Sequence, residues 1–233
     1  MALIWEGLRQ AVWLLVTGDR EVLEITALSL RISLTATAVS LILGIPAGTV
    51  LALSAFPGRR LAIALVNTGM GLPPVVVGLV VSLFLWRSGP LGFLEILYTP
   101  TAMILAQVCL AAPVVTGLTL AALQQVNPML RLQLLGLGAS RIQVTLLLLR
   151  EARLPLLAAV MAGFGAVISE IGASLMVGGN IKGQTRVLTT ATVLETGKGN
   201  FDVAIALSAI LLLLTFLVNW ALTWIQQRRP ARA

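Results

Sequence analysis

The 233-residue sequence contains no histidine, one cysteine, and charged residues at only 11% of its positions. Because Cys109 is alone, it cannot form a disulfide within the chain, and without histidine there is no Cys/His nucleophile or histidine metal cluster. Most enzyme chemistries therefore lose their usual residues. We predict a chain with no catalytic residue, no metal site and no cofactor of its own.

Hydrophobic residues are abundant by contrast, at 58% of the sequence. A helix needs roughly 20 mostly apolar residues to cross a bilayer. Five runs reach about that length: 26–53, 61–86, 100–123, 156–177 and 203–225. The sequence predicts an all-α, polytopic membrane protein with about five transmembrane helices, and residues 26–225 form its membrane domain.

The N-terminal segment, residues 1–25, is predicted to lie on the membrane surface. Its apolar residues recur at helical spacing, and Trp5 and Trp13 are suited to anchor a helix among lipid headgroups. Glu6 and Arg9 interrupt the apolar run, so we do not interpret it as a cleaved signal peptide. The expected partners of this segment are membrane lipids.

The basic residues predict the orientation. The first loop, the connector at about 124–155 and the tail at 226–233 carry nine basic residues and one acid, whereas the other connections carry seven basic residues and seven acids. Because basic loops stay in the cytoplasm, we expect the connector and C-terminus inside and the N-terminus outside. The net charge of +7 reflects this bias, and we expect no nucleic-acid partner.

Two of the apolar runs contain features that are unusual for a membrane helix. The stretch "NTGMGLPPVVVG" (67–78) has three glycines and a Pro-Pro pair, which predicts a broken helix. Such a break serves either a substrate path or a structural kink. In the fourth run, Glu170 is an acid at membrane depth and hence a candidate functional residue. It could pair with Arg31, accept hydrogen bonds from backbone or hydroxyl groups, or be protonated.

The polar segment 178–202 is predicted to be extracytoplasmic, with a short helix in "RVLTTATVLE" that lies against or dips into the membrane. On the opposite side, "LLGLGASRIQVTLLLLREARLP" (134–155) predicts a helix, a turn and a second helix on the membrane surface. Gly136 and Gly138 permit the turn, and Ser140 can cap the second helix.

The stretch "LGLGASRIQ" resembles the glycine-centred part of the EAA loop, by which permeases of ABC importers contact their ATP-hydrolysing subunits. The usual Glu-Ala-Ala positions hold Leu132, Gln133 and Leu134 here, and Pro155 follows Gly138 by about one helical turn more than is usual. The stretch "SEIGASLMVGGNIKGQTRVLTTATVLETGKG" is similar to a segment of molybdate and sulfate permeases, and the five-span form looks most like tungstate importer permeases.

This resemblance implies a multi-pass permease in the cytoplasmic (inner) membrane of a prokaryote, with tungstate as the favoured substrate and molybdate, sulfate or another oxyanion as alternatives. Two copies would form the path, two ABC ATPases would bind ATP and dock on the connector, and an extracytoplasmic binding protein would deliver the oxyanion. An ATP-independent channel or secondary transporter is the more distant alternative, and a membrane-embedded enzyme the most distant. The ATPase-coupling residues implied are Leu132, Gln133, Leu134, Gly136, Gly138, Ala139, Ser140 and Arg141.

For the translocation path, we expect backbone amides in and after the broken helix to face the oxyanion, and small and hydroxyl-bearing residues to let it pass without a deep trap. The candidates are Gly71, Pro73, Pro74, Gly78, Ser169, Glu170, Gly172, Ala173 and Ser174. A carboxylate would repel a dianion, so we expect Glu170 to support the fourth span from behind the path, with direct gating as the alternative.

Overall fold

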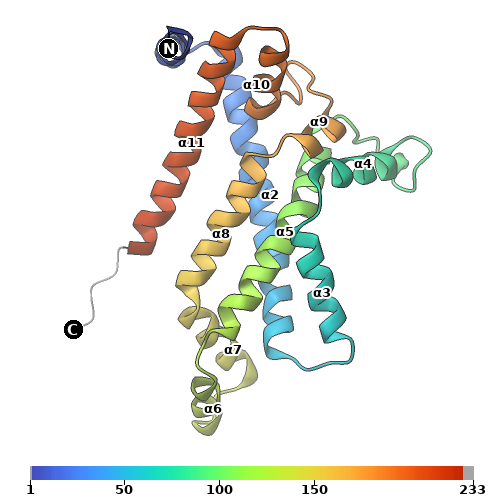
Figure 1. Cartoon of the computed structure of the whole chain (residues 1–233). Helices are drawn as coiled ribbons and strands as arrows, with labels where there is room; N and C mark the ends of the chain where they lie inside the picture. The colour runs from blue at the N-terminus through green and yellow to red at the C-terminus, as the bar shows by residue number, and fades with distance from the viewer. Residues whose placement is uncertain (1, 228–233) are drawn as a thin grey trace.

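The computed structural model describes residues 2–227, apart from the side chains at positions 2–4, 8, 14 and 15. The described part is helical and contains no strand (Figure 1). Its elements are α1 (Ala2–Thr17), α2 (Arg20–Leu53), α3 (Arg59–Met70), α4 (Pro74–Leu85), the 3-10 turn η1 (Gly92–Leu94), α5 (Pro100–Gln124), α6 (Pro128–Gly136), α7 (Arg141–Glu151), α8 (Arg153–Ile168), α9 (Gly172–Gly178), α10 (Leu188–Gly197) and α11 (Phe201–Gln227).

Three of these helices, α2, α5 and α11, are long and apolar enough to cross a membrane. Two bent pairs can add one span each: α3 with α4, which meet at 104°, and α7 with α8, which meet at 70°. Among the described residues the structure thus has three to five candidate spans, which includes the predicted five.

The second and fourth apolar runs are not single helices. The predicted break in the second run is confirmed, because α3 ends at Met70 and α4 begins at Pro74. The sequence did not predict a break in the fourth run, where α8 ends at Ile168 and α9 begins at Gly172. A polar residue inside the run causes this second break, as the geometry of Glu170 shows below.

Close packing of α2 against α5 forms the centre of the bundle. A side chain added at Gly44 would come within 2.7 Å of Val115, and one at Gly48 within 2.6 Å of the Thr116 carbonyl oxygen. Only glycine permits this approach, which holds the two backbones together as small residues do in membrane helices. The buried hydroxyls of Ser29 and Thr37 on α2 donate to carbonyl oxygens one turn earlier, whereas the buried Ser40 hydroxyl has no hydrogen-bond partner among the described residues.

The predicted N-terminal helix is present as α1, and it packs against α11 around Ala11, Ala206 and Leu207. Trp5 and Trp13 are 73% and 61% exposed, as anchors in lipid must be, although their place in a membrane stays a prediction. The first long helix begins at Arg20, earlier than the apolar run, because Asp19 caps it by accepting from the Val22 amide. The basic tail lies outside the described residues beyond Gln227.

The connector and the polar segment at 178–202 occupy opposite ends of the bundle. In Figure 1, α6 and α7 form the lower end, whereas α10 and the start of α2 lie at the upper end. This arrangement separates two candidate sites, which are described in turn.

Candidate functional sites at the two ends of the bundle

The connector turns sharply at Gly138. The Ala139 amide donates to the Leu134 carbonyl at 3.0 Å, and the Gly138 amide donates to the Leu135 carbonyl at 3.0 Å. This pair of bonds is the Schellman motif, which ends a helix with one residue in the left-handed region. Gly138 has φ +82°, a conformation that favours glycine.

The next helix begins directly after this turn. Ser140 caps α7 through a capping box: the Ser140 hydroxyl accepts from the Gln143 amide at 3.4 Å, and the Gln143 side chain accepts from the Ser140 amide at 2.8 Å. The predicted helix, turn and helix are therefore confirmed, and so is the cap at Ser140. These local hydrogen bonds define the corner between α6 and α7.

An apolar cluster attaches the connector to the bundle. Val144, Leu148 and Ala152 are buried with Ala122 and Leu123 at the end of α5. Partly buried residues of α2 and α8 complete the cluster, together with Leu130, Leu134 and Ala139 of the connector. A displacement of α7 would therefore act on the ends of three bundle helices at once.

The outer face of the connector is apolar and exposed. Leu137 is 84% exposed, Ile142 73% and Leu132 60%. Leu134 and Ala139, which the resemblance also implied as coupling residues, are partly buried and pack inward in the cluster. Gln133, Gly136, Gly138, Ser140 and Arg141 are also exposed. An exposed apolar patch of this kind marks a contact with another protein or with a membrane.

At the other candidate site, the two helix breaks lie against each other. Helix α4 packs on α9 so closely that a side chain at Gly78 would come within 2.8 Å of the Ala173 Cα. A side chain at Gly172 would come within 2.7 Å of Val75. The structure thus brings together the two groups of residues that the sequence proposed separately for the path.

The members of this group differ in exposure. Gly71, Pro73, Pro74 and Ser169 are exposed, Glu170 and Gly172 are half-buried, and Gly78, Ala173 and Ser174 are buried. Ser174 accepts a hydrogen bond at 3.2 Å from the side-chain amide of Gln107 on α5, so its hydroxyl holds α9 to α5. The exposed residues are the better candidates for a path.

Backbone amides near Gly71 are already used within the break. The Gly71 amide donates to the Thr68 carbonyl at 3.0 Å and the Leu72 amide to the Gly69 carbonyl at 3.4 Å, while Pro73 and Pro74 have no amide hydrogen. The expectation that these amides face an oxyanion stays a prediction, and the geometry offers it little support.

Glu170 ends one helix and starts the next. Its carboxylate accepts from the Ala173 amide in the first turn of α9 at 3.0 Å, and its carbonyl oxygen accepts from the Thr189 hydroxyl at 3.1 Å. Among the described residues it forms no ion pair with Arg31. Of the three alternatives for Glu170, hydrogen bonding to the backbone matches this geometry.

Thr185 fixes the turn between α9 and α10 and was missed by the sequence reasoning. Its buried hydroxyl donates to the Gly178 carbonyl at 2.5 Å and accepts from the Ile181 amide at 3.0 Å. The predicted short helix follows as α10, and the Leu188 amide at its start donates to Ser29 of α2 at 2.8 Å. A threonine two residues after a glycine was the only local signal.

Charged pairs surround this end of the molecule. Glu21 on α2 accepts from Lys182 at 2.6 Å and from Arg186 at 3.5 Å. Near the end of α10, hydrogen bonds from Asn200 and then from Lys198 hold the pKa of Glu195 below its ordinary value. The connector, by contrast, is held by backbone bonds and apolar packing.

Comparisons with known proteins agree with this architecture. A solved chain of the MetNI methionine ABC transporter, in an inward facing conformation, superposes with a TM-score of 0.73 over 93% of this chain and 96% of that chain, at 23% identity. At that identity the match shows the fold alone, which is the fold of an ABC importer permease.

Sequence relatives are closer. The chain is 42% identical over 229 residues to the tungstate uptake system permease protein TupB of Peptoclostridium acidaminophilum, covering 97% of this chain and 100% of that protein. It is 45% identical over 213 residues to a probable anion ABC transporter permease protein of Haloferax volcanii, covering 89% of this chain and 92% of that one. Residues 44–229 match the family model described as binding-protein-dependent transport system inner membrane component. The chain belongs to this family of inner membrane transport components.

Proposed function

We propose that this chain is the permease subunit of an ATP-driven importer that carries tungstate across the cytoplasmic membrane. The observation that carries the proposal is the 42% identity, over nearly the whole chain, to a tungstate uptake permease. ATP hydrolysis would reside in a partner ATPase, and an extracytoplasmic binding protein would deliver the oxyanion. In this orientation the connector and the C-terminus face the cytoplasm, and the α10 end faces outward.

The ATPase would dock on the exposed apolar face of the connector. Leu132, Leu137 and Ile142 are exposed there, and no acidic residue occupies the usual Glu-Ala-Ala positions. Burial of such side chains in a partner's groove would give affinity through the hydrophobic effect in place of a salt bridge. Two copies of the chain would enclose the path, and closure of the ATPases on ATP would tilt α8 through the apolar cluster at its base.

The path itself would run past the exposed residues at the two breaks, Gly71, Pro73, Pro74 and Ser169. Glu170 would support the break from behind, because its carboxylate is engaged by the Ala173 amide. A dianion would then meet small and apolar groups, which let it pass without tight binding.

The docking proposal is tested with Leu137→Ala in the full chain, purified with its ATPase. Loss of a central, fully buried leucine contact costs about 1–3 kcal/mol, so we expect the ATPase to dissociate roughly tenfold more readily. The matched control is Leu212→Ala, which changes a similarly exposed leucine on α11 (70% exposed) and should leave ATPase retention unchanged. Equal retention by both variants would contradict docking on the connector.

The substrate is tested by uptake of labelled tungstate into vesicles that contain the complete importer, with molybdate and sulfate as competitors. Relatives of this chain include permease proteins of sulfate and molybdenum transport systems, so these are the alternative substrates. We expect tungstate to compete best and uptake to require ATP. Uptake that persists without ATP would favour a channel or secondary transporter instead.

A further inference from the structure

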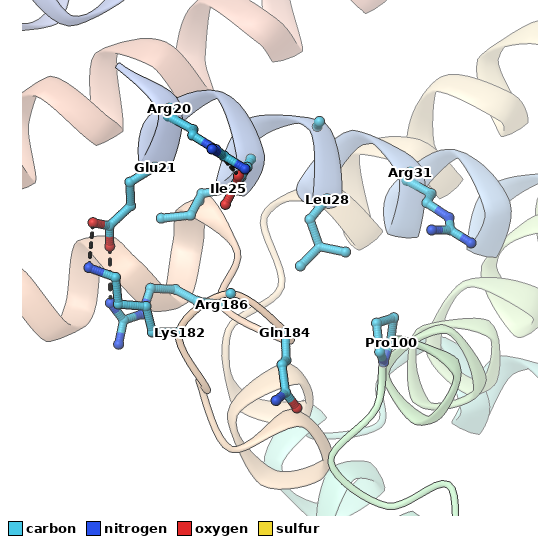
Figure 2. A pocket seen from close by; sticks show the side chains of 12 residues that line it. Arg20, Glu21, Ile25, Leu28, Arg31, Pro100, Lys182, Gln184 and Arg186 are labelled. Carbon is cyan, nitrogen blue, oxygen red and sulfur yellow. Dashed lines mark hydrogen bonds and ion pairs between the residues drawn. The ribbon is translucent and has the colours of Figure 1, made fainter.

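A cleft of about 770 Å³ opens at the α10 end of the molecule, between the first three turns of α2, the turn at 182–186 and the start of α5 (Figure 2). Four cations and two carboxylates line it, for a net charge of +2; they are Arg20, Arg31, Lys182, Arg186, Glu21 and Glu24. A cleft lined by an excess of one sign of charge concentrates ions of the other sign.

The cations are distributed unevenly within the cleft. At one end Glu21 bridges Lys182 and Arg186, and Arg20 pairs with Glu24 at 2.9 Å. At the other end Figure 2 shows the Arg31 guanidinium projecting towards Pro100, away from the Glu21 group. None of the ion pairs found among the described residues includes Arg31.

Arg31 is exposed on the wall of the cleft and lies further along α2 than Arg20. It follows Arg20 by eleven residues, which is about 16 Å along a helix axis. A charged side chain within an apolar helix is costly, and where it persists it commonly serves a substrate or ion. The guanidinium is also the side chain best shaped to bind a tetrahedral oxyanion through two parallel hydrogen bonds.

Two further features of the cleft favour an anion. Helix α5 begins at Pro100 on the wall of the cleft, so the positive end of a 25-residue helix lies there. The Gln184 side chain also lines the cleft and can donate from its amide. On the same wall the Arg186 Nε is buried and has no hydrogen-bond partner among the described residues.

We propose that this cleft is an entry subsite for a free oxyanion dianion, with Arg31 as the anchoring residue. The inference rests on the proposed function as an oxyanion permease and names a place where the ion is held before it passes between the helices. Lys182 provides a second contact when the oxyanion displaces the Glu21 carboxylate from the Lys182 ammonium group. The two carboxylates oppose the dianion and keep the site weak, as transit requires.

The test is binding of tungstate to the full chain in nanodiscs of phosphatidylcholine, measured by isothermal titration calorimetry. Removal of a charge-assisted pair of hydrogen bonds should weaken binding about tenfold or more in Arg31→Gln. Arg31→Lys keeps the charge and should remain within a few-fold of the native chain. The control Arg87→Gln removes an exposed arginine outside the cleft and should leave binding unchanged. Melting temperatures of all variants verify that they are folded.

Three results would overturn the proposal. The first is native tungstate binding in folded Arg31→Gln, or no binding by the native chain. The second is a lipid occupant: phosphatidylglycerol in the nanodisc abolishes tungstate binding, and native mass spectrometry finds that lipid retained by the native chain but lost from Arg31→Gln. The third is a docking role, in which Arg31→Gln releases the binding protein while tungstate binding to the permease is unchanged.

Uptake by the complete importer separates this inference from the proposed function. If the native importer takes up no oxyanion, the proposed function fails. If it takes up tungstate and Arg31→Gln does so equally well, only the subsite fails. We expect uptake by Arg31→Gln to fall several-fold at low tungstate concentration and Arg31→Lys to restore most of it.

Discussion

The two ends of the molecule turn the chain by different means. The connector turns at Gly138 through backbone hydrogen bonds and leaves leucines exposed, whereas the α9–α10 segment (169–200) turns through buried hydroxyls and charged pairs. A corner fixed by its own backbone leaves its side chains free to contact a partner. In a turn fixed by side chains, those side chains are engaged in bonds within the chain and are not free to contact a partner. Such a turn suits a segment beside a polar cleft.

The largest effect on stability is expected from Thr185→Val in the α9–α10 segment. Valine keeps the shape but leaves the Gly178 carbonyl and the Ile181 amide without a partner, at about 1–3 kcal/mol for each buried group. We expect a clearly lower melting temperature in detergent. Thr196→Val is the control, because Thr196 is exposed and donates only within its own helix. A melting temperature equal to that of the control would mean that the turn does not depend on side chains.

A smaller effect on stability is expected from Gly138→Val in the connector. The position has open space around it but φ +82°, so the cost is backbone strain of about 1–3 kcal/mol. Because that strain falls on the corner, we expect ATP hydrolysis coupled to transport to fall more than the melting temperature does.

Gly136→Ala is the matched control for this corner. Gly136 also has open space around it, but it lies in α6, where alanine fits. If coupled ATP hydrolysis is as high in Gly138→Val as in Gly136→Ala, the backbone conformation at Gly138 does not set the geometry of the connector.

The smallest effect is expected from Glu170→Gln. Glutamine keeps the oxygen that accepts from the Ala173 amide, so stability should change by less than about 1 kcal/mol and uptake should persist. Glu170→Ala removes the acceptor and should cost about 1 kcal/mol more. A folded Glu170→Gln that no longer transports would assign Glu170 a gating role in place of a supporting one.

The sequence predicted features that depend on neighbouring residues. Gly138 and Ser140 together specify the end of one helix and the start of the next, and the Pro-Pro pair specifies the break before α4. Leu134 and Ala139 were expected at the coupling surface but pack inward. For Leu134 a local signal exists. Its spacing of four from Leu130 places both on the inner face of α6, and this periodicity would have identified it.

Features that join distant parts of the chain could not be predicted. Glu21 and Lys182 are 161 positions apart, and no local pattern relates them. The break after Ile168 was not predicted for a different reason: the segment contains no proline. Its signal is an acidic residue three positions before a free amide, which is an N-cap pattern inside an apolar run.

Ala152 is both the C-cap of α7 and the N-cap of α8, so it is the only residue between the two helices. Helix α8 then acts as a lever of 16 residues, about 24 Å long. A rotation of about 10° at the connector would move its far end by about 4 Å, more than a hydrogen bond tolerates. The bond from Thr189 to Glu170 would then have to break, or α10 would have to travel with α8, and a small movement at one end of the molecule would become a large one at the other.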